Sequence, residues 1–213
     1  MSTMTLTIRP ALATDVDGLS ALAGLTFPLA CPRDLPRASV EAFVRDSLGP
    51  ASFRGYLEDP THRLLAGVGP DGDVLAYALL IEGTAMDESC ARVISSRPTV
   101  GVSKFYLHPC LHGSGEAGRL LDVVIRLAQD SGARSLWLAT NVANSRALAF
   151  YARSGFERRG HRDFMVGGVR NLDVVLERPV QRPLCAMGQG GPDGWTAGTD
   201  ILEPGSAADR LEA

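Results

Sequence analysis

The sequence predicts an α/β (α+β) domain in which a mixed central sheet is flanked by helices. Short runs of aliphatic and β-branched residues alternate with amphipathic segments of helical period along the chain. The 213 residues are 45% hydrophobic and 21% charged, which is the composition of a soluble globular protein. A chain of this length can bury a core without disulfides or a structural metal.

Each expected element rests on a local pattern. The clearest helix is 115–130, where charged residues occupy one face and aliphatic residues the other, and Ser131-Gly132 stops it. The Gly-Pro-Asp-Gly run at 69–72 joins two strands as a hairpin. The other expected helices are one that opens at 14–17 and is broken by Pro28, 39–48 and 144–154. The expected strands are 6–10, 63–68, 74–81, 99–107, 136–139, 156–162 and 172–176.

Charge argues against a nucleic-acid partner. The formal net charge is -3, whereas nucleic-acid-binding domains usually carry a basic excess. The 21 cationic side chains are unevenly divided, because Lys104 is the single lysine and the rest are arginines. Genomic base composition is the simpler explanation of that bias.

Cysteine spacing and hydropathy indicate a cytoplasmic protein. Cys31, Cys90, Cys110 and Cys185 include no C-x-x-C pair, which argues against a structural zinc site and a secreted disulfide framework. Residues 1–18 lack the apolar core of a signal peptide, and no apolar run is long enough to span a membrane. The glycine- and proline-rich segment 181–213 is expected to be a weakly packed tail after a domain at 1–180.

A glycine-rich loop between strand 99–107 and helix 115–130 is the main candidate site. Free backbone N–H groups and the helix dipole make such a loop an anion site suited to phosphates. Gly113, Gly115 and Gly118 also spell G-x-G-x-x-G, the dinucleotide fingerprint. That fingerprint needs an acidic residue after the next strand, where this chain has Thr140-Asn141, so an NAD-dependent oxidoreductase is the weaker alternative.

Two motifs together resemble those of a known family. The segment 112–117, His-Gly-Ser-Gly-Glu-Ala, resembles the pyrophosphate loop Q/R-x-x-G-x-G/A of the GNAT N-acetyltransferases. Asn144, with the following Ala147, Phe150-Tyr151 and Gly155-Phe156, resembles the family's N-x-x-A-x-x-F-Y-x-x-x-G-F. The resemblance covers about residues 5–178 and implies a sheet with splayed strands and acetyl-CoA as cosubstrate, without a metal. The segment 160–165 with Asp173 is similar to bacterial polyamine acetyltransferases.

The resemblance implies roles for individual residues. The phosphates would lie on the amides of 113–118, and the pantetheine arm would bond to the edge of the strand that contains Leu107. The Leu107 N–H would polarise the thioester carbonyl, and Tyr151 would protonate the leaving thiolate. The expected cofactor-binding residues are Phe105, Tyr106, Leu107, His112, Gly113, Ser114, Gly115, Glu116, Ala117, Gly118, Asn144 and Tyr151.

The general base is left open by the sequence. Glu82 could act through a water, His108 and His161 are alternatives because histidine is a common general base, and an amine can also lose its proton before it binds. His108 and His112 could suggest a metal pair, but no third ligand accompanies them.

We therefore expect an acetyl-CoA-dependent N-acetyltransferase acting on a primary amine. Its acceptor would be a small molecule, such as a polyamine or an amino compound, or a protein N-terminus. A non-catalytic acyl-CoA-binding module is the first alternative. The sequence is compatible with a homodimer, and neither nucleic acid nor a membrane is an expected partner.

Overall fold

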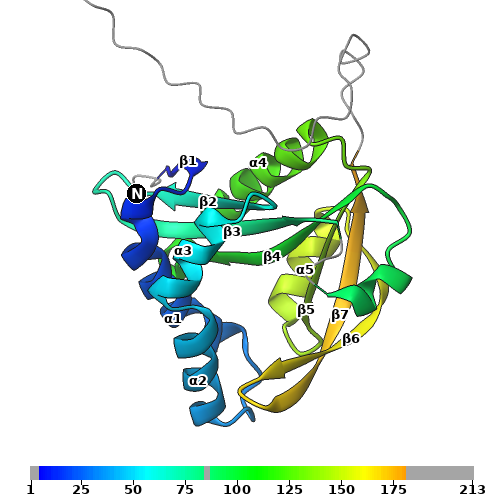
Figure 1. Ribbon diagram of the computed structural model, residues 1–213, viewed down its shortest axis with the longest axis horizontal. Coiled ribbons are helices and arrows are strands. Elements are labelled where there is room, and N and C mark those ends of the chain that lie inside the picture. The colour runs from blue at the N-terminus through cyan, green and yellow to red at the C-terminus, as the bar shows by residue number, and fades with distance from the viewer. Residues whose placement is uncertain (1–4, 84–86, 181–213) are drawn as a thin grey trace, which may run out of the picture.

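A computed structural model describes residues 5–83 and 87–180, so the expected tail 181–213 lies outside the described residues. One sheet of seven strands runs through the domain in the order β1-β2-β3-β4-β5-β7-β6 (Figure 1). Only β4 and β5 are parallel, and every other neighbouring pair is antiparallel. The strands are β1 (Thr7–Pro10), β2 (His62–Val68), β3 (Val74–Glu82), β4 (Thr99–Leu107), β5 (Ser135–Asn141), β6 (Glu157–Val166) and β7 (Val169–Pro179).

Helices cover both faces of this mixed sheet, as the sequence predicts. The first three pack with Tyr77 and Leu79 of β3 on one face, and the last two pack with Ala76 and Ala78 on the other. The helices are α1 (Val16–Ala30), α2 (Arg37–Ser47), α3 (Pro50–Glu58), α4 (Glu116–Asp130) and α5 (Ser145–Arg153).

The helical prediction is wrong at two places near the N-terminus. Helix α1 continues through Pro28 to Ala30, because a proline in the last turn sacrifices only one late hydrogen bond. Helix α3 is missing from the prediction. It has nine residues with Gly55 inside, and it is stabilised by tertiary packing of Phe53, which is fully buried.

The closing strands β6 and β7 are longer than predicted. They are joined at Gly167-Gly168, where both residues have positive φ, of 53° and 83°. A two-residue turn of this kind suits glycine at both positions, and the Gly-Gly pair is the signal that could have located it. A Cβ at Gly167 would overlap the backbone of Ser39, so this turn packs directly on α2.

The parallel strands β4 and β5 separate part-way along their length. They are paired from Thr99 opposite Ser135 to Val102 opposite Leu138 and no further. A register shift against β3 follows at once, since Leu80 pairs with Val102 and Leu79 with Lys104. The bulge at Ser103 increases the local twist and turns the rest of β4 away from β5. The expected splayed strands are therefore present.

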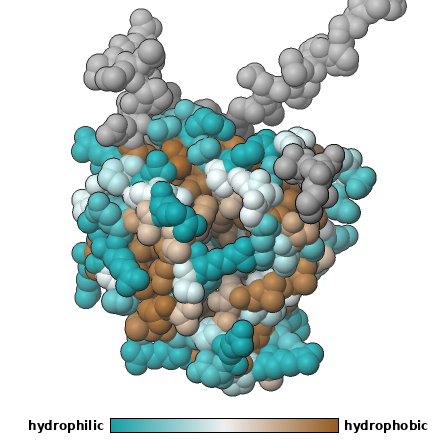
Figure 2. All heavy atoms as spheres, turned by 180° about the vertical axis from the view of Figure 1, so that it is seen from behind, coloured by the Kyte–Doolittle hydropathy of each residue, from teal (hydrophilic) through white to brown (hydrophobic). Residues whose placement is uncertain are grey.

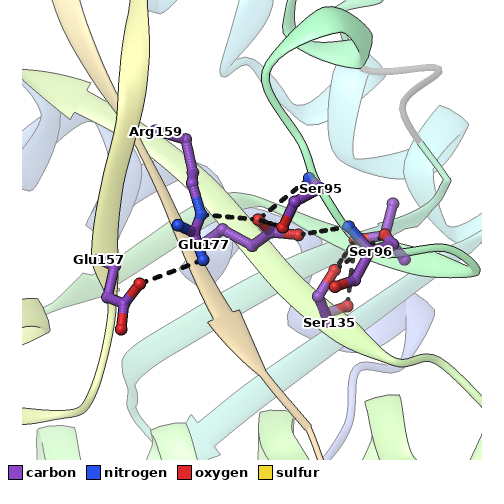
Figure 3. A network of polar contacts seen from close by, with 7 residues as sticks. Ser95, Ser96, Ser135, Glu157, Arg159 and Glu177 are labelled. Atoms are coloured by element: carbon purple, nitrogen blue, oxygen red, sulfur yellow. Dashed lines mark hydrogen bonds and ion pairs between the residues drawn. The ribbon is translucent and has the colours of Figure 1, made fainter.

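A buried carboxylate holds the closed end of this opening together (Figure 3). Glu177 of β7 is 1% exposed and accepts hydrogen bonds from the backbone N–H groups of Ser95 and Ser96, at 3.1 Å each. It also bonds the Ser95 hydroxyl at 2.7 Å and Arg159 Nε at 2.9 Å. Burial alone would raise the Glu177 pKa, but these hydrogen bonds outweigh it and lower the pKa. The ionised carboxylate ties the segment before β4 to β7.

The surface opposite the view of Figure 1 is a mosaic of polar and apolar side chains (Figure 2). Among the described residues, no helix is long and apolar enough to cross a membrane. The large exposed apolar side chains there and elsewhere are Leu12, Leu25, Leu29, Val142, Met165 and Leu172.

Candidate active site

The loop at 112–118, hereafter the glycine loop, leads from β4 into α4. Gly113 and Gly115 have φ of 81° and 87°, the left-handed region that favours glycine. Gly115 is the N-cap of α4, so the N–H groups of Ala117 and Gly118 fall in the first turn and have no partner within the helix. A Cβ at Gly113, Gly115 or Gly118 would meet no protein atom within 4 Å, so the loop is open to a ligand.

The charged side chains around the glycine loop also suit an anion. Arg146 of α5 places Nη1 2.9 Å from His112 Nδ1, and burial followed by the nearby Arg146 charge lowers the His112 pKa. Glu116, the acid within the loop, has its carboxylate engaged by other parts of the chain. Its carboxylate is 4% exposed and accepts hydrogen bonds from Leu6 N and Arg119. Arg146 is a candidate phosphate contact that the sequence motifs did not indicate.

The open half of β4 presents backbone groups to the gap beside β5. His108 N donates to Leu75 O at 2.7 Å, which makes this a hydrogen-bonded antiparallel pair. Hydrogen-bonded pairs alternate along antiparallel strands, so Tyr106 and Lys104 also bond to β3. The N–H and C=O groups of Phe105 and Leu107 therefore point the other way, toward the opening between β4 and β5. An extended arm can bind there as an added strand would.

Tyr151 and Asn144 lie on α5, close to this opening. The Tyr151 ring is edge-on to Phe105, with centroids 6.2 Å apart, and is 6% exposed. Burial, and to a smaller extent Tyr106, raises the Tyr151 pKa, so the phenol keeps its proton at neutral pH. Asn144 accepts a hydrogen bond from Ala147 N at 3.1 Å, which confirms it as the cap of α5.

A pocket of about 280 Å³ meets the opening from the α1–α3 face of the sheet. We call it the β4 pocket, because Ser103, Lys104 and Tyr106 of β4 form its floor. Its other lining residues come from α1 to α3, the end of β5, and β6 and β7: Phe27, Ala30, Cys31, Pro32, Phe43, Ser47, Leu48, Tyr56, Ala139, Thr140, Asn141, Arg162, Phe164, Val166, Asn171 and Asp173.

One carboxylate lies in the wall of the β4 pocket. Asp173 of β7 is 5% exposed and pairs across the sheet with Asn141, at the open end of β5. Burial raises its pKa, and the nearby Arg162, whose Nη2 is 3.4 Å from Asp173 Oδ2, only partly opposes that effect. Burial and, to a smaller extent, the charge of Asp173 raise the pKa values of Cys31 and Tyr106, which line the same pocket.

The comparisons with known proteins decide the family. The model of the Acetyltransferase (GNAT) family matches residues 31–156, more than half of the chain. The chain belongs to the GNAT family. Uncharacterized N-acetyltransferases of Mycobacterium bovis and Mycobacterium tuberculosis are 39% identical to it over 165 residues, which is 78% of this chain and 97% of theirs. The protein is thus an acetyl-CoA-dependent N-acetyltransferase.

Solved GNAT structures share the fold at low sequence identity. The PaiA N-acetyltransferase of Thermoplasma acidophilum, solved in complex with coenzyme A, superposes with a TM-score of 0.65 at 16% identity and covers 83% of this chain and 99% of its own. A GCN5-related N-acetyltransferase of Rhodopseudomonas palustris gives a TM-score of 0.64 at 19% identity, covering 84% and 98%.

The β4 pocket of this GNAT protein is not lined by Glu82, His108 or His161, the bases that the sequence suggested. Glu82 pairs with Val100 on the paired half of β4, before the bulge, and does not line the pocket. His108 caps the turn after β4 by accepting from Cys110 N at 3.2 Å, and His161 is exposed on β6. The sequence indicates Asp173 only through the similarity of segment 160–165 with Asp173 to bacterial polyamine acetyltransferases. Nothing in the sequence places it beside Tyr106, because a long-range strand pairing brings them together.

Proposed function

We propose that the protein transfers the acetyl group of acetyl-CoA to the primary amine of a small molecule bound in the β4 pocket. The observation that carries this proposal is the position of that pocket. It opens onto β4 where the strand leaves β5, on the sheet face opposite α4 and α5. A thioester beside Phe105 and Leu107 would be within reach of an amine in the pocket.

The residues present fit a CoA ligand. The glycine loop offers N–H groups in open space, with His112 and Arg146 beside it. The N–H groups of Phe105 and Leu107 would bond to the arm and to the thioester carbonyl, where they would stabilise the oxyanion that develops. Asn144, the N-cap of α5, would be a further CoA contact. Side-chain burial leaves Tyr106 facing the β4 pocket rather than the arm.

Proton transfer would be divided between the two sides of β4. The amine nitrogen attacks the carbonyl carbon, the C–N bond forms, and the C–S bond breaks. Tyr151 donates its phenolic proton to the departing thiolate, because its raised pKa keeps it protonated. Asp173 accepts the proton that the attacking amine loses, and its raised pKa makes it a stronger base than an exposed carboxylate.

The closed side of the β4 pocket favours a small molecule over a protein N-terminus. Phe43 of α2 and Phe164 of β6 meet edge-on with centroids 5.6 Å apart, and the turn at Gly167 packs on Ser39. A polypeptide acceptor would need a groove that continues past this contact. The volume of about 280 Å³ is at the lower end for ligand pockets.

The test is an acetyl-CoA turnover screen over amine classes, read by thiol release. We expect turnover with small amines and little with peptides, and Asp173→Asn lowers kcat/KM by about a hundredfold. Asp163→Asn, an exposed carboxylate on the same hairpin, is the matched control and keeps wild-type rates. A loss with Glu82→Gln but not with Asp173→Asn would transfer the base to Glu82. Turnover of peptides alone would overturn the small-molecule acceptor.

A further inference from the structure

Lys104 is a half-buried cation in the β4 pocket that the proposed acetyl transfer does not use. It is the single lysine of the chain, and it follows the bulge of β4 directly. Its side chain is half-buried in the floor of the β4 pocket. The ammonium nitrogen lies 4.5 Å from the centroid of the Tyr56 ring of α3. A lysine in such a place needs a physical explanation, because most lysines extend into solvent.

No carboxylate of the described residues pairs with this ammonium. The ion pairs of the described chain all involve arginine or histidine, and Asp173 is the one acid that lines the β4 pocket. Burial, rather than a neighbouring charge, lowers the Lys104 pKa to about 8. The cation–π contact with Tyr56 offsets only part of the lost hydration. The charge is therefore available to a ligand.

The two charged ends of the β4 pocket come from different strands of the sheet. Lys104 pairs with Leu79 of β3 and leans toward α3, whereas Asp173 is on β7, beyond β5. The opening for the thioester is on the Asp173 side. Arg162, the other cation of the pocket lining, is already paired with Asp87 at 3.1 Å and with Asp173 at 3.4 Å. An acceptor amine near Asp173 thus has its far end near Lys104.

The wall between the two ends is apolar and aromatic. Phe27 and Phe43 stack with centroids 4.6 Å apart, and Phe164 meets Phe43 edge-on. Cys31 adds no charge, because burial and the nearby Asp173 raise its thiol pKa to about 11. A polyamine would place its second ammonium beside Lys104 and would find no second carboxylate in the lining.

We propose that Lys104 binds a carboxylate on the acceptor, so that the substrate is a small amino acid-like compound with an apolar body and not a polyamine. This inference rests on the proposed function of the β4 pocket. It assigns the amine to the Asp173 end, the apolar body to the phenylalanine wall, and the carboxylate to the Lys104 end.

The experiment compares acceptors that differ only in the carboxylate. Phenylalanine, phenylalaninamide and phenethylamine are tested with acetyl-CoA beside spermidine, together with leucine and its amide. We expect kcat/KM for the free amino acids to exceed that of the matched amides and amines at least tenfold. Lys104→Met removes this difference by raising KM for the amino acids, and Lys104→Arg keeps part of it. CoA affinity stays unchanged in both variants, which reports intact folding.

Three results would overturn the inference. They are equal or faster turnover of spermidine, retention of the carboxylate preference in Lys104→Met, and an acetyl adduct on Lys104 in the intact mass of protein treated with acetyl-CoA alone. Calorimetry with N-acetylphenylalanine and N-acetylphenethylamine in the presence of CoA reads the same preference without turnover. If no amine is acetylated but Lys104-dependent carboxylate binding remains, the proposed function fails and the carboxylate site stands.

Discussion

The two faces of β4 recognise their proposed ligands by different means. On the α4 and α5 side, the proposed donors are backbone N–H groups of the glycine loop, Phe105 and Leu107, and every residue except proline carries such a group. On the α1–α3 face, the β4 pocket offers the side chains of Lys104 and Asp173. In the proposed mechanism, cofactor binding would depend on backbone conformation, while acceptor choice would depend on residue identity. Substitutions can separate the two.

The largest expected effect is a loss of kcat when the proposed proton donor of the acetyl transfer is removed. Tyr151→Phe removes one hydroxyl and keeps the ring contacts with Phe105 and Phe156, so the protein folds. We expect kcat to fall by about a hundredfold, since the thiolate loses its proton donor. Release of the CoA thiol with time measures kcat. Calorimetry should find the CoA affinity of the variant within about twofold of wild type. Unchanged turnover would show that Tyr151 serves only as an aromatic anchor.

The next effect belongs to the cofactor face alone. Gly115→Val places a branched side chain at φ 87°, where the phosphates approach, and should weaken CoA binding at least about tenfold. Gly72→Val is the matched control, because Gly72 has φ 90°, equally open surroundings and a place in the β2–β3 turn, outside the glycine loop. Calorimetry with CoA compares the two. Equal losses in both variants would mean that strain, not ligand contact, sets the affinity.

A smaller effect tests the wall of the acceptor face. Gly167→Ala forces a Cβ against the Ser39 backbone, whereas Gly168→Ala meets open space at a similarly positive φ. Both lose about 1 kcal/mol to the left-handed backbone, and Gly167→Ala loses about 1–3 kcal/mol more to overpacking. Thermal melts give the difference in Tm. We also expect a raised acceptor KM in Gly167→Ala only, and equal melts would mean that α2 and the turn do not pack together.

The smallest effect is a pH dependence confined to the acceptor face. The Lys104 pKa of about 8 means that its ammonium is charged at neutral pH and loses its proton above that value. Binding of N-acetylphenylalanine, whose carboxylate stays ionised, should weaken about tenfold from neutral pH to about pH 9. Tyr56, Tyr106 and Cys31 have raised pKa values and remain neutral over this range. Lys104→Arg should abolish the dependence, and a persistent one would point to another group.

The contrast between backbone conformation and side-chain placement also explains how much of the fold and of the site the sequence could predict. The glycine loop and the Asn144 cap follow from motifs within short stretches, because backbone conformation is encoded locally, whereas the splay of β4 is what the family resemblance implies. Helix α3 was missed because Phe53 packing, not propensity, stabilises it. The sequence does not place Asp173 in the β4 pocket, because the β5–β7 pairing, over thirty residues apart in sequence, sets its neighbours. Glu82 stands at the end of β3, and only the strand pairing shows that it lies opposite Val100, on the half of β4 that stays paired with β5.

The lone lysine has a consequence beyond substrate recognition. Every other cationic side chain is an arginine, whose guanidinium remains protonated and is a poor nucleophile toward thioesters. The exterior of this acetyltransferase therefore carries no side-chain amine that acetyl-CoA could acetylate. The protein can work in a high concentration of acetyl donor without its surface charge being eroded by self-modification.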